Sequence, residues 1–390
     1  MNALKKYGPL LLLVLLLSCE KEIKFRQAVS SPMLVMESVV VPDSAMQVRL
    51  SRSRFFLEST NRFSFVPDAD LQLFVNGVPT EQLSYDDEGW YRAAYVPRSG
   101  DRLRLEAVAP SLPAVHAEET VVTGVADFQP GDSTSSYTTS QVADYEVYIN
   151  DSLAYVYVSR TDGFDYLIVP ASRLPEVVTG VVCHDYRYRV EFVFTDQADR
   201  ADYYELSLQP DFNAGTLDHP DFFTDGNFFY GSATFSMESR SLRTSNYYLD
   251  LDADDETGDG FMALAGTAAR RFSDEFFNGE QVRISLVLHL YDYDAIDGEG
   301  KAVPLSEGVQ MRLGVTLSCL SENYYLFRQS MDSASDDDLI GVFSEPVQVY
   351  SNIDGGVGIL GSYCDKSAVR LLTTPNFSQR VYDPDRFIYY

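Results

Sequence analysis

Alternation of apolar and polar residues dominates the chain and predicts β-strands along most of its length. ADLQLFVNGV at 69–78 alternates and then reaches Asn76-Gly77. Asn-Gly is typical of a tight hairpin turn, because both central residues of a type I′ turn need positive φ. The same β-rich pattern recurs around turns in three nearby runs, at 34–58, 89–96 and 102–110. The segment 30–122 therefore predicts six or seven short strands, which suits an immunoglobulin-like β-sandwich.

The alternation continues after residue 122 and predicts a larger antiparallel β domain over 123–390. Its clearest runs lie at 145–150, 153–160, 186–196, 203–210, 282–294 and 311–320. Residues 129–141 are rich in Ser and Thr and predict a loop or linker just inside this domain. Helical periodicity is weak. It predicts one short helix over 323–334, with Ser321 as its cap, and a second, shorter candidate over 273–279. The expected fold class is therefore mostly β, with one or two short helices.

The first residues indicate an address signal rather than a membrane span. Leu10–Leu17 is an apolar run of eight residues after a basic start, whereas a spanning helix needs about 20. The run ends in Ser-Cys and resembles a bacterial lipobox, with cleavage before Cys19. We therefore expect a lipoprotein signal peptide at 1–18, acylation of Cys19 and a tether over 19–29. The alternative is an ordinary signal peptide followed by a chance cysteine.

Charge and composition narrow the classes of partner. The chain has 58 acidic and 30 basic residues and a formal charge of −28, which becomes about −30 once the lysines of the signal peptide are removed. Such an acidic surface repels nucleic acid and anionic membranes and attracts cations. Hydrophobic residues make up 45% and aromatic residues 13% of the chain, enough to build packed cores.

Motifs of known catalytic chemistry do not occur: the chain has no G-x-S-x-G, no HExxH and no P-loop. Cys183 and His184 are neighbours, but neighbours on a strand point to opposite faces, which argues against a catalytic dyad. His289 lies within an alternating run and is expected to be a packed sheet residue. Cys319 and Cys364 can form a disulfide only if their strands adjoin. We predict that the protein is not an enzyme. A hydrolase whose acid pair is set by the fold alone stays open.

Two acidic stretches offer oxygen ligands for calcium. DLDADDETGDG at 250–260 begins like an EF-hand loop, but Asp255 replaces the required glycine and Phe261 the final glutamate. YDYDAIDGEG at 291–300 concentrates acids in a tight turn. The candidate ligands are Asp250, Asp252, Asp254, Asp292, Asp294 and Asp297. The alternative is two solvated acidic loops with no cofactor.

A third stretch, HPDFFTDGNFFYG at 219–231, gathers aromatic side chains around a turn. Its candidate ligand-binding residues are Phe222, Phe223, Phe228, Phe229 and Tyr230. If they are exposed, they form an apolar patch of the kind that marks an interface. If they are buried, they form a small core beneath a loop.

Several stretches, taken in chain order, resemble the DUF4249 family of Bacteroidota lipoproteins. After the lipobox at Cys19 come SPMLVMESVV, LQLFVNG with a following YRA, ADYYELSL at 201–208, FSDEFFNGE at 272–280 and EPVQVYSNIDGGVGILGSYC at 345–364. The last is the most specific. Together they cover nearly the whole mature chain.

The resemblance carries no catalytic residues, because the family has no established activity. It implies an accessory lipoprotein of a TonB-dependent outer-membrane receptor, and the acids after Cys19 resemble a surface-export signal. We therefore expect a lipid-anchored, surface-exposed outer-membrane protein that binds a ligand and passes it to the receptor. The alternative is a structural or adhesive envelope protein that binds another protein.

Overall fold

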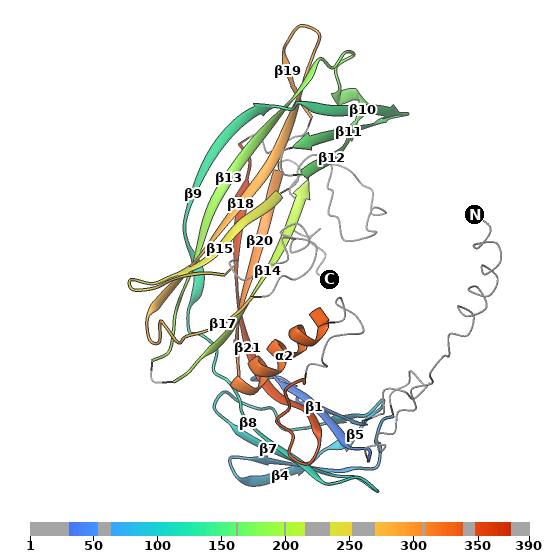
Figure 1. Cartoon of the computed structure of the whole chain (residues 1–390), viewed down its shortest axis with the longest axis vertical. Coiled ribbons are helices and arrows are strands. Elements are labelled where there is room, and N and C mark those ends of the chain that lie inside the picture. The colour runs from blue at the N-terminus through green and yellow to red at the C-terminus, as the bar shows by residue number, and fades with distance from the viewer. Residues whose placement is uncertain are drawn as a thin grey trace, which may run out of the picture.

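The computed structural model describes residues 31–53, 64–160, 163–198, 200–214, 235–251, 270–305, 309–337 and 348–375 (Figure 1). Within these residues the fold is mostly β, as the alternation predicts, and antiparallel pairing predominates. The described part holds one α-helix, α2 (Glu322–Asp337), and one 3₁₀ turn, Ala171–Arg173.

Two sheets face each other over the first part of the chain. A four-stranded sheet has the order β4 (Val78–Gln82), β3 (Asp70–Val75), β7 (Arg102–Val108) and β8 (Val115–Thr120). Against it lie β1 (Leu34–Val40), β2 (Gln47–Arg52), β6 (Trp90–Arg92) and β5 (Ser84–Tyr85), together with the first half of β21 (Val357–Thr373). We call this unit the N-terminal sandwich. Alternate residues such as Leu34, Leu73 and Leu105 are fully buried in its core.

The turns of this sandwich follow the sequence. Asn76 and Gly77 connect β3 to β4 with φ of 53° and 81°, which confirms the predicted hairpin. Asp43, in the Pro-Asp-Ser turn between β1 and β2, has a φ of 58°. Asp and Asn tolerate this left-handed region better than other side chains do.

A second pair of sheets forms the large sandwich. One sheet has the order β16 (Tyr248–Asp250), β15 (Phe235–Arg243), β18 (Gln281–Ile296), β13 (Gly180–Thr195) and β9 (Phe128–Gln141), and β19 (Ala302–Pro304) pairs with β18. The facing sheet contains β17 (Arg270–Ser273), β14 (Tyr203–Ala214), β20 (Val309–Leu320) and the second half of β21. Phe192, Leu288 and Leu317 are fully buried between the two sheets.

A three-stranded sheet adds a third layer at the end of the molecule opposite the N-terminal sandwich (Figure 1). It consists of β10 (Asp144–Asn150), β11 (Leu153–Arg160) and β12 (Gly163–Pro170). Val156 and Leu167 on its inner side pack in one core with Cys183 of β13 and Tyr293 of β18. We call it the distal sheet.

Strand β21 belongs to both sandwiches and runs from one into the other (Figure 1). Its first half pairs in parallel with β1, from Val35 opposite Val357 to Val40 opposite Ser362. Its second half pairs antiparallel with β20, from Leu320 opposite Tyr363 to Gln310 opposite Thr373. The eight-stranded sheet is therefore continuous across the molecule.

Helix α2 confirms the helix that the sequence predicts over 323–334. The Ser321 hydroxyl accepts the N–H of Tyr324 at 3.3 Å, as an N-cap residue does. The helix packs on β21, where the ring of Tyr324 stacks on Tyr363. Gly361 leaves room for this, because a Cβ there would lie 2.8 Å from Tyr324 Cβ.

Two expectations about local structure are wrong. Residues 129–141 are not a linker but lie in β9, an edge strand that pairs with β13 on one side only. Its side chains are mostly exposed, so polar residues such as Ser and Thr are tolerated there. The strand is held by backbone hydrogen bonds to β13 rather than by burial of an apolar face. Residues 273–279 are not a helix: β17 ends at Ser273 and a turn leads into β18.

The cysteines lie in the large sandwich or beneath the distal sheet. Cys319 and Cys364 stand directly opposite each other on β20 and β21, so their strands adjoin. Neither forms a disulfide bond, and Cys183 forms none either.

Candidate functional site

Several of the predicted site residues lie outside the described residues. They are the lipidation site Cys19, the aromatic residues Phe222, Phe223, Phe228, Phe229 and Tyr230, and two of the acidic candidates, Asp252 and Asp254. Of the first acidic loop, Asp250 is described; it is the last residue of β16, and its backbone lies opposite Ser241.

The second acidic loop is described in full, and its carboxylates already have protein partners. Asp294 Oδ2 lies 2.9 Å from His184 Nε2, and this carboxylate raises the pKa of His184. Asp297 accepts the backbone N–H groups of Glu299 at 2.9 Å and Lys301 at 2.8 Å, which shapes the turn before β19. Asp292 is buried on β18. Calcium at this loop stays a prediction.

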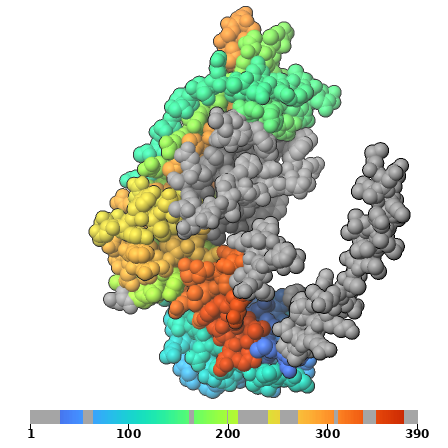
Figure 2. Space-filling view, in the orientation of Figure 1, coloured from blue at the N-terminus to red at the C-terminus, as the bar shows by residue number. Residues whose placement is uncertain are grey.

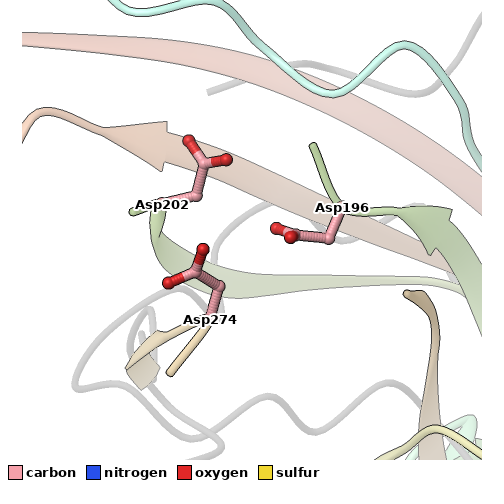
Figure 3. A group of neighbouring side chains, drawn as sticks. All are labelled: Asp196, Asp202 and Asp274. Atoms are coloured by element: carbon pink, nitrogen blue, oxygen red, sulfur yellow. The ribbon is translucent and has the colours of Figure 1, made fainter. Parts of the chain in front are cut away.

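A different group of acids meets inside the large sandwich, and sequence reasoning missed it. Asp196 directly follows β13, Asp202 directly precedes β14, and Asp274 directly follows β17. One carboxylate oxygen of each lies within 4.8 Å of the others, and all three residues are buried. Figure 3 shows the three side chains near one another on separate segments of the chain. We call these residues the aspartate cluster.

Asp196 is held from two sides. The Tyr204 hydroxyl donates a hydrogen bond to Oδ1, and the backbone N–H of Gly279 donates one to Oδ2 at 2.7 Å. Gly279 has a φ of 77°, and a Cβ there would lie 2.9 Å from the Cβ of Ala198. A larger residue would therefore push the turn after β17 away from Asp196.

Asp202 pairs with Arg200, whose Nε lies 2.7 Å from Oδ1. Arg200 also connects the cluster to the segment between the sandwiches, because its Nη2 donates to the Thr123 carbonyl at 3.0 Å. Asp274 is positioned by its backbone N–H, which donates to the Asp202 carbonyl at 3.0 Å. The cluster thus joins two chain turns and the inter-sandwich segment.

Two carboxylate oxygens of the cluster have no hydrogen-bond partner: Asp202 Oδ2 and Asp274 Oδ2. A buried charge without a partner is costly, so the proton is held more tightly. Burial is the main cause that raises the pKa of both Asp196 and Asp274, and the neighbouring aspartates raise it further. The pKa of the Tyr204 hydroxyl is raised as well, by burial and by Asp196.

Comparison with protein families matches residues 20–368 to the family described as "Domain of unknown function (DUF4249)". The chain belongs to the DUF4249 family. The match confirms the resemblance drawn from the sequence. A comparison with curated proteins found no match.

Two of the stretches that carry the DUF4249 resemblance meet at the aspartate cluster. Asp202 lies in ADYYELSL and Asp274 in FSDEFFNGE, which also supplies Gly279. The three aspartates are too far apart in sequence to form a recognisable ligand motif. The one signal in the sequence was that Asp202 and Asp274 both lie in stretches that carry the family resemblance.

A search of the described helices for a membrane span found none of sufficient length and hydropathy.

Proposed function

We propose that this DUF4249 protein is an outer-membrane lipoprotein, acylated at Cys19, that faces the cell surface. In this proposal it binds a ligand as the accessory partner of a TonB-dependent transporter, and it catalyses no reaction. The family match begins at residue 20, directly after Cys19, so the matched region follows the proposed anchor. Two acyl chains suffice for stable anchoring, because each buried CH₂ contributes about 0.8 kcal/mol.

The observation that supports the binding role is a pair of exposed apolar residues, one on each face of the edge strand β10 of the distal sheet. Tyr148 and Ile149 of β10 are 59% and 64% exposed. The distal sheet lies at the end of the molecule opposite the N-terminal sandwich, where the described chain begins (Figures 1 and 2). β10 is the edge strand of this sheet, and an exposed edge strand with apolar side chains is suited to contact a partner protein.

A pull-down from native outer membrane tests the partner. The tagged protein is solubilised in mild detergent, and co-purifying proteins are identified by mass spectrometry. We expect a stoichiometric β-barrel receptor. The double variant Tyr148→Glu/Ile149→Asp should lose it, whereas Val78→Asp should keep it, because Val78 is equally exposed (62%) but lies on the N-terminal sandwich.

Failure to recover any barrel would overturn the transporter role, provided that another lipoprotein–receptor pair survives the same detergent. Recovery of a different envelope protein would favour the adhesive alternative.

The anchor and its orientation need separate measurements. Metabolic labelling with an alkyne fatty acid should mark the wild type and not Cys19→Ser. Protease added to intact cells should degrade the protein if it faces outward. An unlabelled wild type would contradict lipidation, and full protection from protease would contradict surface exposure.

A further inference from the structure

The aspartate cluster carries more negative charge than the protein neutralises. Asp196, Asp202 and Asp274 bring three carboxylates together in the interior, and the cation paired with them in the described part of the chain is Arg200. Mutual repulsion at this distance is strong in a medium of low dielectric constant. The arrangement persists in a fold only if something positive, whether protons or a metal ion, shares the site.

The orphaned oxygens distinguish this cluster from an ordinary buried ion pair. Asp202 and Asp274 are 6% and 4% exposed, yet Oδ2 of each lacks any hydrogen-bond partner. Buried polar atoms are nearly always satisfied, so two unsatisfied acceptors within one cluster point to a missing positive group. The satisfied oxygens, in contrast, hold the carboxylates in place: Asp196 through Gly279, and Asp202 through Arg200.

The donor set is made of oxygen alone, which selects a hard cation. Ca²⁺ binds oxygen at about 2.4 Å, so two ligands on opposite sides of the ion lie up to about 4.8 Å apart. One oxygen of each aspartate lies close enough to the others for all three to reach one ion of this size. Mg²⁺ demands a nearly ideal octahedron at about 2.1 Å and gives up its water ligands reluctantly, whereas Ca²⁺ accepts six to eight oxygens in flexible geometry, which favours Ca²⁺ for a site of three buried carboxylates.

We propose that the aspartate cluster is a calcium site, with Asp196, Asp202 and Asp274 as its protein ligands. The ion would lie among the three side chains drawn in Figure 3. It would join the connection between β13 and β14 to the turn between β17 and β18. Through Arg200 and its bond to Thr123, it would also brace the segment between the two sandwiches. This role is structural and does not depend on the transporter partnership.

Calcium-dependent unfolding of the full-length protein in detergent, first stripped with EDTA, tests the proposal. We expect one Ca²⁺ per chain and a rise in Tm of about 5 °C at saturating Ca²⁺, with a smaller rise in Mg²⁺. Terbium bound at the site should luminesce on excitation of tyrosine, because Tyr204 bonds to Asp196, and Ca²⁺ should quench this signal by displacement.

Two isosteric variants and one matched control make the result specific. Asp202→Asn and Asp274→Asn should each weaken Ca²⁺ binding by about tenfold or more, since each loses a charged ligand. In EDTA, Asp274→Asn should melt at or above the wild-type temperature, because it removes repulsion. Asp87→Asn is the control: it removes one charge from an exposed turn of the N-terminal sandwich and belongs to none of the candidate calcium groups.

If the Tm and the terbium signal of the wild type do not change with Ca²⁺, the proposal is wrong. The unsatisfied oxygens would then be explained by protons shared among the carboxylates. Binding by Asp202→Asn and Asp274→Asn as tight as by Asp87→Asn would also overturn it and place any calcium elsewhere. If one variant does not fold, the other variant and the Ca²⁺ titration of the wild type still test whether the aspartate cluster binds calcium.

Discussion

The two sandwiches share a strand but differ in what they bury. Among the described residues, the buried positions of the N-terminal sandwich are apolar apart from Ser38, Ser51, Glu119 and Ser362. The large sandwich and its distal layer bury charged or titratable residues in several places, namely Asp165, Asp196, Asp202, Arg240, Asp274, His289 and Asp292. Buried charge costs stability, so its concentration in one region marks that region as the candidate for binding.

The one buried carboxylate of the N-terminal sandwich that the structure describes has a plain structural task. Glu119 Oε2 accepts the hydroxyl of Ser321 at 2.7 Å and so ties β8 to the start of α2. Burial raises the pKa of Glu119. The aspartate cluster differs because Asp202 Oδ2 and Asp274 Oδ2 have no such donor among the described residues. Glu119 is thus a carboxylate that positions a helix, whereas the aspartates of the cluster are the carboxylates that we propose to bind calcium.

The largest expected effect tests whether each sandwich has its own stability. Phe192→Ala removes a fully buried ring that stacks on Phe128, and it should cost about 3–5 kcal/mol. The only tryptophan, Trp90, lies on β6 of the N-terminal sandwich, so its fluorescence reports on that unit. In urea, we expect the circular dichroism transition to move further than the Trp90 transition.

Leu105→Ala is the counterpart in the N-terminal sandwich and should move the Trp90 transition first. If the circular dichroism and Trp90 transitions shift together in both variants, β21 couples the two sandwiches into one cooperative unit, and the sandwiches do not have separate stabilities.

A smaller effect is expected where β21 enters the N-terminal sandwich. Gly358 has a φ of 123°, and a Cβ there would lie 2.0 Å from the Met36 carbonyl oxygen of β1. Gly358→Ala should therefore disrupt the parallel β1–β21 pairing and cost on the order of 3 kcal/mol. Urea unfolding monitored by Trp90 measures this loss.

Gly77→Ala provides the control for that substitution. Gly77 also has positive φ, 81°, but nothing lies within 4 Å of its added Cβ, so only about 1 kcal/mol of backbone strain is expected. Equal losses in the two variants would show that the close approach to β1 is unimportant.

The pH dependence of stability should reveal the aspartate cluster in metal-free protein. Burial raises the folded-state pKa of Asp196 and Asp274 above the ordinary 3.8, so the folded protein holds these protons more tightly than the unfolded chain. Their contribution is complete below about pH 4 and is lost as the pH rises through the folded-state pKa. Tm measured in EDTA should therefore fall with rising pH, and less steeply for Asp274→Asn.

Asp297→Asn should reproduce the wild-type slope, because it leaves the cluster intact. Identical slopes in wild type and Asp274→Asn would refute the idea that the cluster governs this part of the pH profile.

The smallest effect concerns reactivity rather than stability. Burial raises the pKa of Cys319 to about 12, so at pH 8 only about one thiol in 10⁴ is a reactive thiolate. Cys364 is less buried. With iodoacetamide and peptide mass spectrometry, we expect native Cys364 to be labelled faster than Cys319, and both to be labelled alike in urea. Equal native rates would mean that the interior of the large sandwich opens easily.

Much of the fold is predictable because the local sequence patterns favour the same elements that the tertiary structure contains. Alternation placed β3, β7, β13, β18 and β20, Asn76-Gly77 placed a turn, and Ser321 placed the start of α2. The failures have physical causes. Residues 129–141 lack an apolar face, and an edge strand such as β9 needs backbone pairing rather than burial. Residues 273–279 carry an apolar pair, but Gly279 at positive φ favours a turn.

The sequence by itself determined the β class, the net negative charge and the family, because each depends on composition, periodicity or short motifs. The tertiary structure decided that β21 serves two sandwiches and that Cys319 faces Cys364. It also brought Asp196, Asp202 and Asp274 together. These facts depend on strand pairing between distant segments, and neither residue spacing nor local propensity encodes which distant strands will meet.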